Sequence, residues 1–244
     1  MFDNRLPVFL PLFSASMLFF AASGNSRADV LTVDDDDPAA DFATIQEAVD
    51  AAAEGDRIEV GPGYYFADSK SLVPVVVIDG KSIEIVAINV DPAMTVIAGQ
   101  GIRRCVEWSD ADGSCKLDGF TLDSGYSDTD GGGLLIDRSA VEVQGCVFEG
   151  CTAVGSGGAI ASISETALPP IARNCRFVAN TAGVSGGGID ADGGFDLFDC
   201  VFENDTSELY GGGIHVSGDP FGKSNYSIVQ NCEFHRCESK YGGG

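Results

Sequence analysis

The sequence predicts an all-β protein, a right-handed parallel β-helix whose first coil is capped by an α-helix. A Gly-Gly-apolar motif recurs at intervals of 25, 30 and 25 residues, and a Cys-x-Phe motif recurs between its copies at intervals of 29, 25 and 32. No helix-length periodicity lies between the motifs. A repeat of this length made of short strands is typical of one β-helix coil, and we expect about seven coils over residues 41–244.

The first 28 residues are predicted to be a secretory signal peptide. Arg5 precedes an apolar run, Leu6–Ala22, and Ser26-Arg27-Ala28 is a small-x-small cleavage pattern. The alternative is a membrane anchor, but a run of 17 residues with two prolines is short for a span. We therefore expect a secreted, extracellular or cell-surface protein with no membrane span after cleavage.

Residues 29–40, which include Asp34–Asp37, are predicted to be an acidic linker, and residues 41–55 a capping helix. Thr44 and Glu47 have capping-box spacing, and Gly55 is a stop signal. An amphipathic helix here would cover the open end of a solenoid. The apolar stripe of the helix is Phe42, Ile45, Val49 and Ala52, and the expected early strands are Arg57–Val60, Val75–Ile78, Ile83–Ile88 and Met94–Ala98.

The repeats can be aligned in columns, because equivalent residues of neighbouring coils lie about 4.8 Å apart. Counted from the second Gly of each motif, the first and third residues are apolar and are predicted to face inward. The Cys and Phe of the second motif form two more inward columns, and Gly, Asn or Asp precedes each Cys at a predicted left-handed corner. The first residues are Leu134, Ala159, Ile189 and Ile214, and the third residues are Ile136, Ala161, Ala191 and Val216. The Cys-x-Phe pairs are Cys146/Phe148, Cys175/Phe177, Cys200/Phe202 and Cys232/Phe234, and the corner residues are Gly145, Asn174, Asp199 and Asn231. Loops are expected at residues 164–170 and 219–224.

These residues resemble two groups of proteins. The stretches from Thr44 to Val49 and from Gly55 to Tyr65 are similar to the opening of pectin-lyase-like β-helix proteins. Gly157–Ile160 and Phe177–Asn180 resemble the GGAI and FxxN repeats of chlamydial polymorphic outer membrane proteins. The resemblance implies a β-helix fold, and it leaves lyases, hydrolases and adhesins open as functions. Because the chain stops at the start of a coil, we also expect its C-terminal end to be incomplete.

Charge narrows the choice of partner. Lys and Arg number 14 against 37 Asp and Glu, a net charge of −23, which disfavours nucleic acid and anionic membranes. Cationic partners and divalent metals remain possible partners, whereas acidic polysaccharides would be repelled unless Ca²⁺ bridged them. The eight Cys residues include no CxxC and do not indicate zinc; structural thiols or disulfide bridges are expected.

The candidate site lies on the outward positions of the repeats. Asp190 and His215 are predicted on adjacent coils as a catalytic acid–base pair. Four residues are candidates for substrate binding, and four carboxylates could hold Ca²⁺. The alternative is a solvated outer face with one favourable cross-strand pair. The substrate candidates are Asp192, Ser217, Asp137 and Arg138, and the Ca²⁺ candidates are Asp128, Asp130, Asp190 and Asp192.

We therefore predict an exported β-helix module that binds a polysaccharide or a surface protein, or serves a structural role. The alternative is a carbohydrate-active enzyme, a lyase or a hydrolase, on acidic polysaccharide. No Arg-x-Pro-x-x-Arg pattern of the pectate-lyase kind is present, and fold alone does not decide between these functions.

Overall fold

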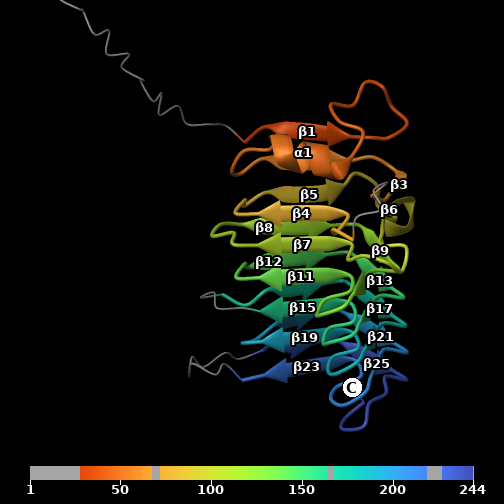
Figure 1. Cartoon of the computed structure of the whole chain (residues 1–244). Coiled ribbons are helices and arrows are strands. Elements are labelled where there is room, and N and C mark those ends of the chain that lie inside the picture. Colours follow the sequence, from red (N-terminus) through yellow and green to blue (C-terminus); the bar gives the residue numbers. More distant parts are fainter. Residues whose placement is uncertain (1–27, 68–71, 164–167, 219–226, 244) are drawn as a thin grey trace, which may run out of the picture.

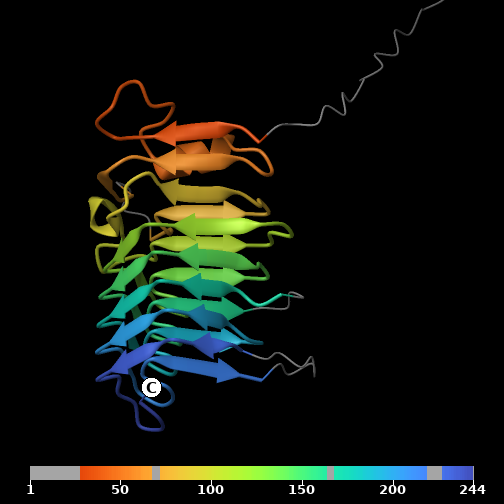
Figure 2. The same ribbon diagram turned by 180° about the vertical axis from the view of Figure 1, so that it is seen from behind.

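Short parallel strands stack along one axis to form a right-handed parallel β-helix, as predicted (Figure 1). The computed structural model describes residues 28–67, 72–163, 168–218 and 227–243. The predicted signal peptide therefore lies outside the described residues except for Ala28, as do most of the two predicted loops. Figure 2 shows from behind the same continuous order from β1 at one end to the last coil at the other. Within the described ranges, no helix is long and apolar enough to cross a membrane.

Four parallel sheets, here called A to D, run along the solenoid. Each strand pairs with its equivalents in the coils before and after it, and sheet B has seven strands, one per coil. Sheet A contains β1 Val30–Val33, β2 Arg57–Val60, β5 Glu84–Ala87, β8 Cys115–Asp118, β12 Val141–Gln144, β16 Ile171–Arg173, β20 Asp196–Phe198 and β24 Val229–Gln230. Sheet B contains β3 Gly63–Tyr65, β6 Thr95–Ala98, β9 Thr121–Asp123, β13 Val147–Glu149, β17 Arg176–Val178, β21 Val201–Glu203 and β25 Glu233–His235.

The other two sheets complete each coil. Sheet C contains β4 Val76–Asp79, β7 Val106–Ser109, β11 Leu134–Asp137, β15 Ile160–Ile163, β19 Ile189–Asp192 and β23 Ile214–Ser217. Sheet D contains β10 Tyr126–Ser127, β14 Thr152–Ala153, β18 Thr181–Ala182 and β22 Thr206–Ser207. A single 3₁₀ turn, η1 Pro92–Met94, precedes β6 in the described chain.

The first segment of the N-terminal end differs from its prediction. Residues 29–40 are not simply a linker, because β1 pairs in parallel with β2 and begins sheet A. Its Val-Leu-Thr-Val sequence is rich in β-branched residues, which favour strands. The acidic run that follows forms a turn in which the Asp34 carboxylate accepts hydrogen bonds from the backbone N–H groups of Asp36 and Asp37.

The capping helix predicted over residues 41–55 is present as a shorter helix, α1 Ile45–Ala51, with Phe42 before its N-cap and Ala52 as its C-cap. The Thr44 hydroxyl accepts a hydrogen bond from the Glu47 backbone N–H, and the Glu47 carboxylate accepts one from the Thr44 N–H, so the capping box is complete. Ile45, Ala48 and Val49 are buried against the first coils. The helix therefore covers the core at this end, as Figure 1 shows.

Thr44→Ala is expected to lower the free energy of unfolding by about 1 kcal/mol, because it removes the N-cap oxygen. Thr44→Ser keeps that oxygen and should cost less than half as much. Urea denaturation of both variants measures the difference, and equal losses would show that the capping oxygen contributes nothing.

The alignment of the second Gly-Gly motif is shifted by one residue from the prediction. Leu134 pairs with Ile160 and Ile160 pairs with Ile189, so Ile160, not Ala159, belongs to the first inward column. Ser162, not Ala161, belongs to the third. Ala159 instead takes the position held by the third Gly of the other coils.

The corners are tight turns of left-handed backbone. The predicted corner before each Cys is confirmed, with φ of 59° at Gly145, 52° at Asn174, 55° at Asp199 and 55° at Asn231. A second column of corner residues, one directly after each of several strands of sheet B, was not predicted. Its members with positive φ include Ser124, Gly150, Ala179, Asn204 and Arg236.

The core is built from stacked columns of like residues. The rings of Phe148, Phe177, Phe202 and Phe234 stack nearly parallel, with successive centroids 5.1, 4.4 and 4.7 Å apart. The Cys column beside them is also inward, and all eight Cys residues carry free thiols. The core therefore uses cysteine as a small apolar residue.

A buried polar ladder crosses the coils beside the phenylalanine stack. The Asn180 side-chain oxygen accepts a hydrogen bond from the Cys151 N–H (3.0 Å), and its amide nitrogen donates to the Phe148 carbonyl (3.1 Å). In the next coil, Asp205 Oδ1 accepts from both the backbone and the side-chain nitrogen of Asn180 (2.9 and 2.8 Å). Asp205 Oδ2 is buried and has no hydrogen-bond partner in the described structure.

Candidate functional site

Four polar residues share the outer surface of two neighbouring strands near one end of sheet C. β19 and β23 pair so that Asp190 lies opposite His215 and Asp192 lies opposite Ser217. The alternate residues of β19 are buried in the core, so these aspartates point outward. The adjacency predicted from the repeat alignment is therefore present in the structure.

A hydrogen bond joins the two residues of each pair. His215 Nδ1 lies 2.7 Å from Asp190 Oδ1, and the Ser217 hydroxyl donates to Asp192 Oδ1. The Asp190 side chain is only 15% exposed, whereas the His215 side chain is 31% exposed. The mostly buried carboxylate thus holds the imidazole from the neighbouring strand, and the ring remains partly open to solvent.

The environment of Asp190 favours its protonated form. Burial raises the pKa of Asp190 to about 6, the His215 hydrogen bond opposes that rise, and the charges of Asp192 and Asp130 add to it. A carboxyl group with a pKa in this range can exchange protons near neutral pH. Ion pairs that only stabilise a structure also shift pKa values, so the raised pKa of Asp190 does not by itself identify a catalytic residue.

Two tyrosines extend the polar cluster. The Tyr210 ring centroid lies 5.7 Å from that of His215 and 5.3 Å from that of Tyr241. Tyr210 and Tyr241 are 45% and 53% exposed. Neither was predicted, although each directly precedes a run of glycines, as a repeated feature of the sequence. Together with the four polar residues, they form what we call the His215 face: Asp190, Asp192, Tyr210, His215, Ser217 and Tyr241.

Asp137 and Arg138, predicted to bind substrate at the same site, lie apart from the His215 face. β15 separates β11 from β19, and Ile163 occupies the position between Asp137 and Asp192. The Arg138 guanidinium bonds both carboxylate oxygens of Asp110, at 2.7 and 2.8 Å, and also pairs with Asp137. These residues form a surface ion-pair network that binds coil to coil.

The predicted Ca²⁺ ligands are not assembled into a site. Asp128 accepts a hydrogen bond from the Tyr126 hydroxyl (2.7 Å), and Asp130 accepts one from the Ser156 backbone N–H (2.7 Å). Across the described ranges, no three His, Cys, Asp or Glu side chains converge in a way that could hold a metal ion. Sequence spacing placed these carboxylates near the same surface, but their hydrogen bonds direct them to separate partners.

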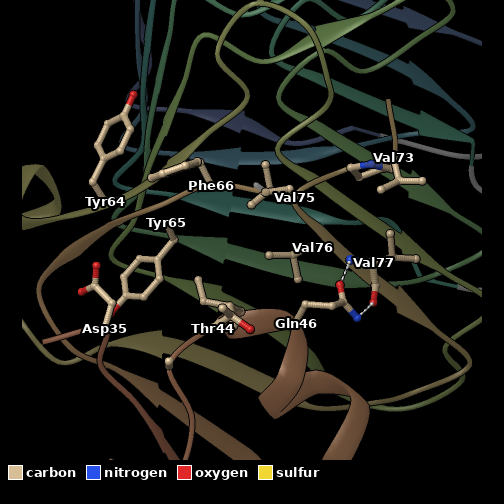
Figure 3. Close-up of a pocket in the computed structure, with 14 residues that line it drawn as sticks. Asp35, Thr44, Gln46, Tyr64, Tyr65, Phe66, Val73, Val75, Val76 and Val77 are labelled. Atoms are coloured by element: carbon tan, nitrogen blue, oxygen red, sulfur yellow. Dashed lines mark hydrogen bonds between the residues drawn. The ribbon is translucent and has the colours of Figure 1, made fainter. Parts of the chain in front are cut away.

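A groove at the opposite end of the solenoid was not predicted. It has a volume of about 650 Å³ and opens between the start of α1, the end of β3 and the segment leading into β4 (Figure 3). Tyr64 and Phe66, each 47% exposed, and Val73, 52% exposed, are among its wall residues. The sequence signal was the Tyr64-Tyr65-Phe66 run, of which Tyr64 and Tyr65 entered the sequence analysis only through the resemblance to pectin-lyase-like proteins.

Comparison with known proteins supports the fold. No family model and no curated protein matches the chain. Its structure is similar to the crystal structure of Escherichia coli YbhC, with a TM-score of 0.51 and 12% identity over 95% of this chain and 75% of that one. Carrot pectin methylesterase is a further similar structure, with a TM-score of 0.36 and 11% identity over 87% of this chain and 89% of that one. At such identities the likeness is one of fold, and the repeat resemblance to outer membrane proteins stays a prediction. The chain therefore shares a fold with YbhC, and that fold is the parallel β-helix described above.

Proposed function

We propose that the chain is an exported β-helix module that binds a neutral polysaccharide through the His215 face. The observation that carries this proposal is the exposed stack of Tyr241, Tyr210 and His215 beside outward carboxylate and hydroxyl groups. Aromatic rings offer apolar faces at low entropic cost, and a few convergent polar groups fix the orientation of a ligand. Sugars present both kinds of surface.

The charge of the chain favours a neutral ligand over an acidic one. With a net charge of −23, the surface repels polyuronates. On the His215 face itself, the acidic groups are Asp190 and Asp192, which would face any bound sugar carboxylate. Hydroxyl groups of a neutral sugar could instead donate hydrogen bonds to these carboxylates.

The test is affinity electrophoresis of the protein through gels that contain neutral or acidic polysaccharides. His215→Ala and Tyr210→Ala are each expected to weaken binding to the retained glycan by about 10-fold, equivalent to about 1.4 kcal/mol. His235→Ala is the matched control, because His235 is also paired with a carboxylate, Glu233, but lies on sheet B. Unchanged retention of both face variants, or equal loss in the control, would refute the proposal.

A second candidate function rests on the Asp190–His215 contact of 2.7 Å. Such a pair can act as acid and base, which would suit a carbohydrate-active enzyme. Release of reducing ends would indicate a hydrolase, and absorbance at 235 nm would indicate an eliminating lyase. If the pair is catalytic, the rate should change with pH near 6, where Asp190 titrates, and Asp190→Asn should abolish the activity.

A further inference from the structure

The groove of Figure 3 has the features of a ligand site that is separate from the His215 face. Its volume of about 650 Å³ is within the range of small-molecule pockets. It lies beside α1 at the N-terminal end of the solenoid, whereas β23 lies at the far end (Figure 1). We propose that this groove binds a small amphiphilic cation, with the apolar part in the groove and the positive charge toward Asp35.

The polar groups of the groove wall are already bonded to the protein. The Gln46 amide accepts from the Val77 N–H (2.7 Å) and donates to the Val77 carbonyl and to Asp50 Oδ1 (3.2 and 2.8 Å). The Thr44 hydroxyl is held in the capping box, and the Tyr65 hydroxyl donates to the Gly61 carbonyl (3.1 Å). Few groups therefore remain to bind a polar ligand.

The surface left open is apolar. The exposed wall residues are Val73 and the pair Tyr64 and Phe66, whose ring centroids lie 6.0 Å apart, and the buried Val75 and Val76 lie behind them. Removing such apolar surface from water favours binding. The body of a ligand that fits this groove is therefore apolar.

The charge around the groove is negative. Asp35 belongs to its wall and is exposed, and in Figure 3 its carboxylate lies beside the Tyr65 ring. Residues 28–56 contain ten carboxylates and no Lys or Arg. Arg103 donates to the Ala67 carbonyl at the groove, but it is only 3% exposed and therefore offers a ligand no surface for direct contact. A positive group on the ligand complements this field, and a negative group opposes it.

The test compares three ligands with the same eight-carbon chain: octyltrimethylammonium, octyl glucoside and octyl sulfate, each below its critical micelle concentration. Calorimetric titration of the full chain is expected to give saturable binding of the cation at least 10-fold tighter than that of the sulfate, with the glucoside between them. Added salt should reduce this preference, because it screens exposed charges. Equal affinities, or no saturable binding of the cation, would overturn the proposal.

Substitutions locate the binding to the groove. Val73→Arg places a large cation at an exposed wall position and should weaken binding of octyltrimethylammonium at least 10-fold. Asp35→Lys should do the same, and the milder Asp35→Asn should weaken it about 3-fold if the lysine variant does not fold. Glu208→Lys, at an exposed position of the sixth coil, changes net charge by the same amount as Asp35→Lys and should alter affinity less than 2-fold. Equal effects of the two lysine variants would mean a long-range charge effect and no groove site.

Discussion

Asp205→Asn is expected to stabilise the protein at pH 8 by about 4 kcal/mol, an unusually large gain for one substitution. Asp205 is fully buried, and burial raises the pKa of its carboxyl to about 7, against the hydrogen bonds from Asn180 that lower it. A rise of about three units over an unfolded aspartate corresponds to about 4 kcal/mol at 1.36 kcal/mol per unit. At pH 8 the native protein must therefore bury a charge that the unfolded chain exposes to water.

The geometry of the ladder explains why asparagine fits this position. Asp205 Oδ1 receives both hydrogen bonds from Asn180, and Oδ2 has no partner. One coil earlier, the equivalent residue Asn180 donates its amide hydrogen to the Phe148 carbonyl. From this equivalence we infer that Oδ2 of Asp205 faces the Phe177 carbonyl. An ionised oxygen opposes that carbonyl, whereas an amide N–H₂ would donate to it.

The pH dependence follows from the direction of the shift. Because the folded-state pKa is raised, the folded protein binds the proton more tightly, and this contribution to stability is fully present below about pH 4. It is lost as the pH rises through 7, by about 2.5 kcal/mol between pH 5 and pH 8. The pKa of Asp190 is also raised, to about 6, so its ionisation also lowers the stability of the protein as the pH rises, by a smaller amount. The Asp205→Asn variant retains this smaller pH dependence.

Denaturation by urea at pH 5 and pH 8 measures both effects. The matched control is Asp199→Asn, an exposed corner residue whose equivalents in the neighbouring coils are Asn174 and Asn231. It should change stability by less than about 0.5 kcal/mol at either pH. If Asp205→Asn leaves the pH dependence unchanged, the buried carboxyl is not the group that titrates.

The sequence predicted the fold well because each coil repeats the same physical requirements. Columns of Cys, Phe and corner residues such as Asn174 recur at the coil spacing, and two motifs in phase fix the register of a solenoid. The contact between Asp190 and His215 followed from that register alone. It could be predicted because a parallel in-register pair places equivalent residues side by side.

Other features depend on interactions that no repeat encodes. The β-strand propensity of Val30–Val33 can be recognised from its own residues, but its pairing partner cannot. β1 pairs with β2, whose residues lie 27 positions later in the sequence, and the helix between the two strands interrupts the repeat. The groove depends on how Tyr64 and Phe66 leave the first coil. The four Ca²⁺ candidates are not brought together for a related reason, because the partners that hold Asp128 and Asp130 are a local hydroxyl and a backbone N–H of the next coil.

The shifted alignment of the second Gly-Gly copy, Gly157-Gly158, shows at which positions of the motif the structure requires glycine. In three coils a run of three glycines precedes the inward strand, and in the coil of Gly157 and Gly158 the third position is Ala159. The first and middle positions are Gly in all four coils. At Gly187 an added Cβ would lie 2.4 Å from the carbonyl oxygens of both Gly212 and Thr206, which belong to the next coil. Glycine is required there by close approach of backbone to backbone.

Gly187→Ala is therefore expected to destabilise the protein by about 3 kcal/mol, because backbone atoms on both sides must shift. Gly188→Ala should cost less, since Ala159 occupies the equivalent position in the preceding coil. Gly218→Ala should be nearly neutral, because an added Cβ there meets no atom within 4 Å. Urea denaturation of the three variants tests this order. A Gly187→Ala protein as stable as Gly218→Ala would mean that the coils do not approach as closely as the register requires, and the alignment that joins Asp190 to His215 would fail with it.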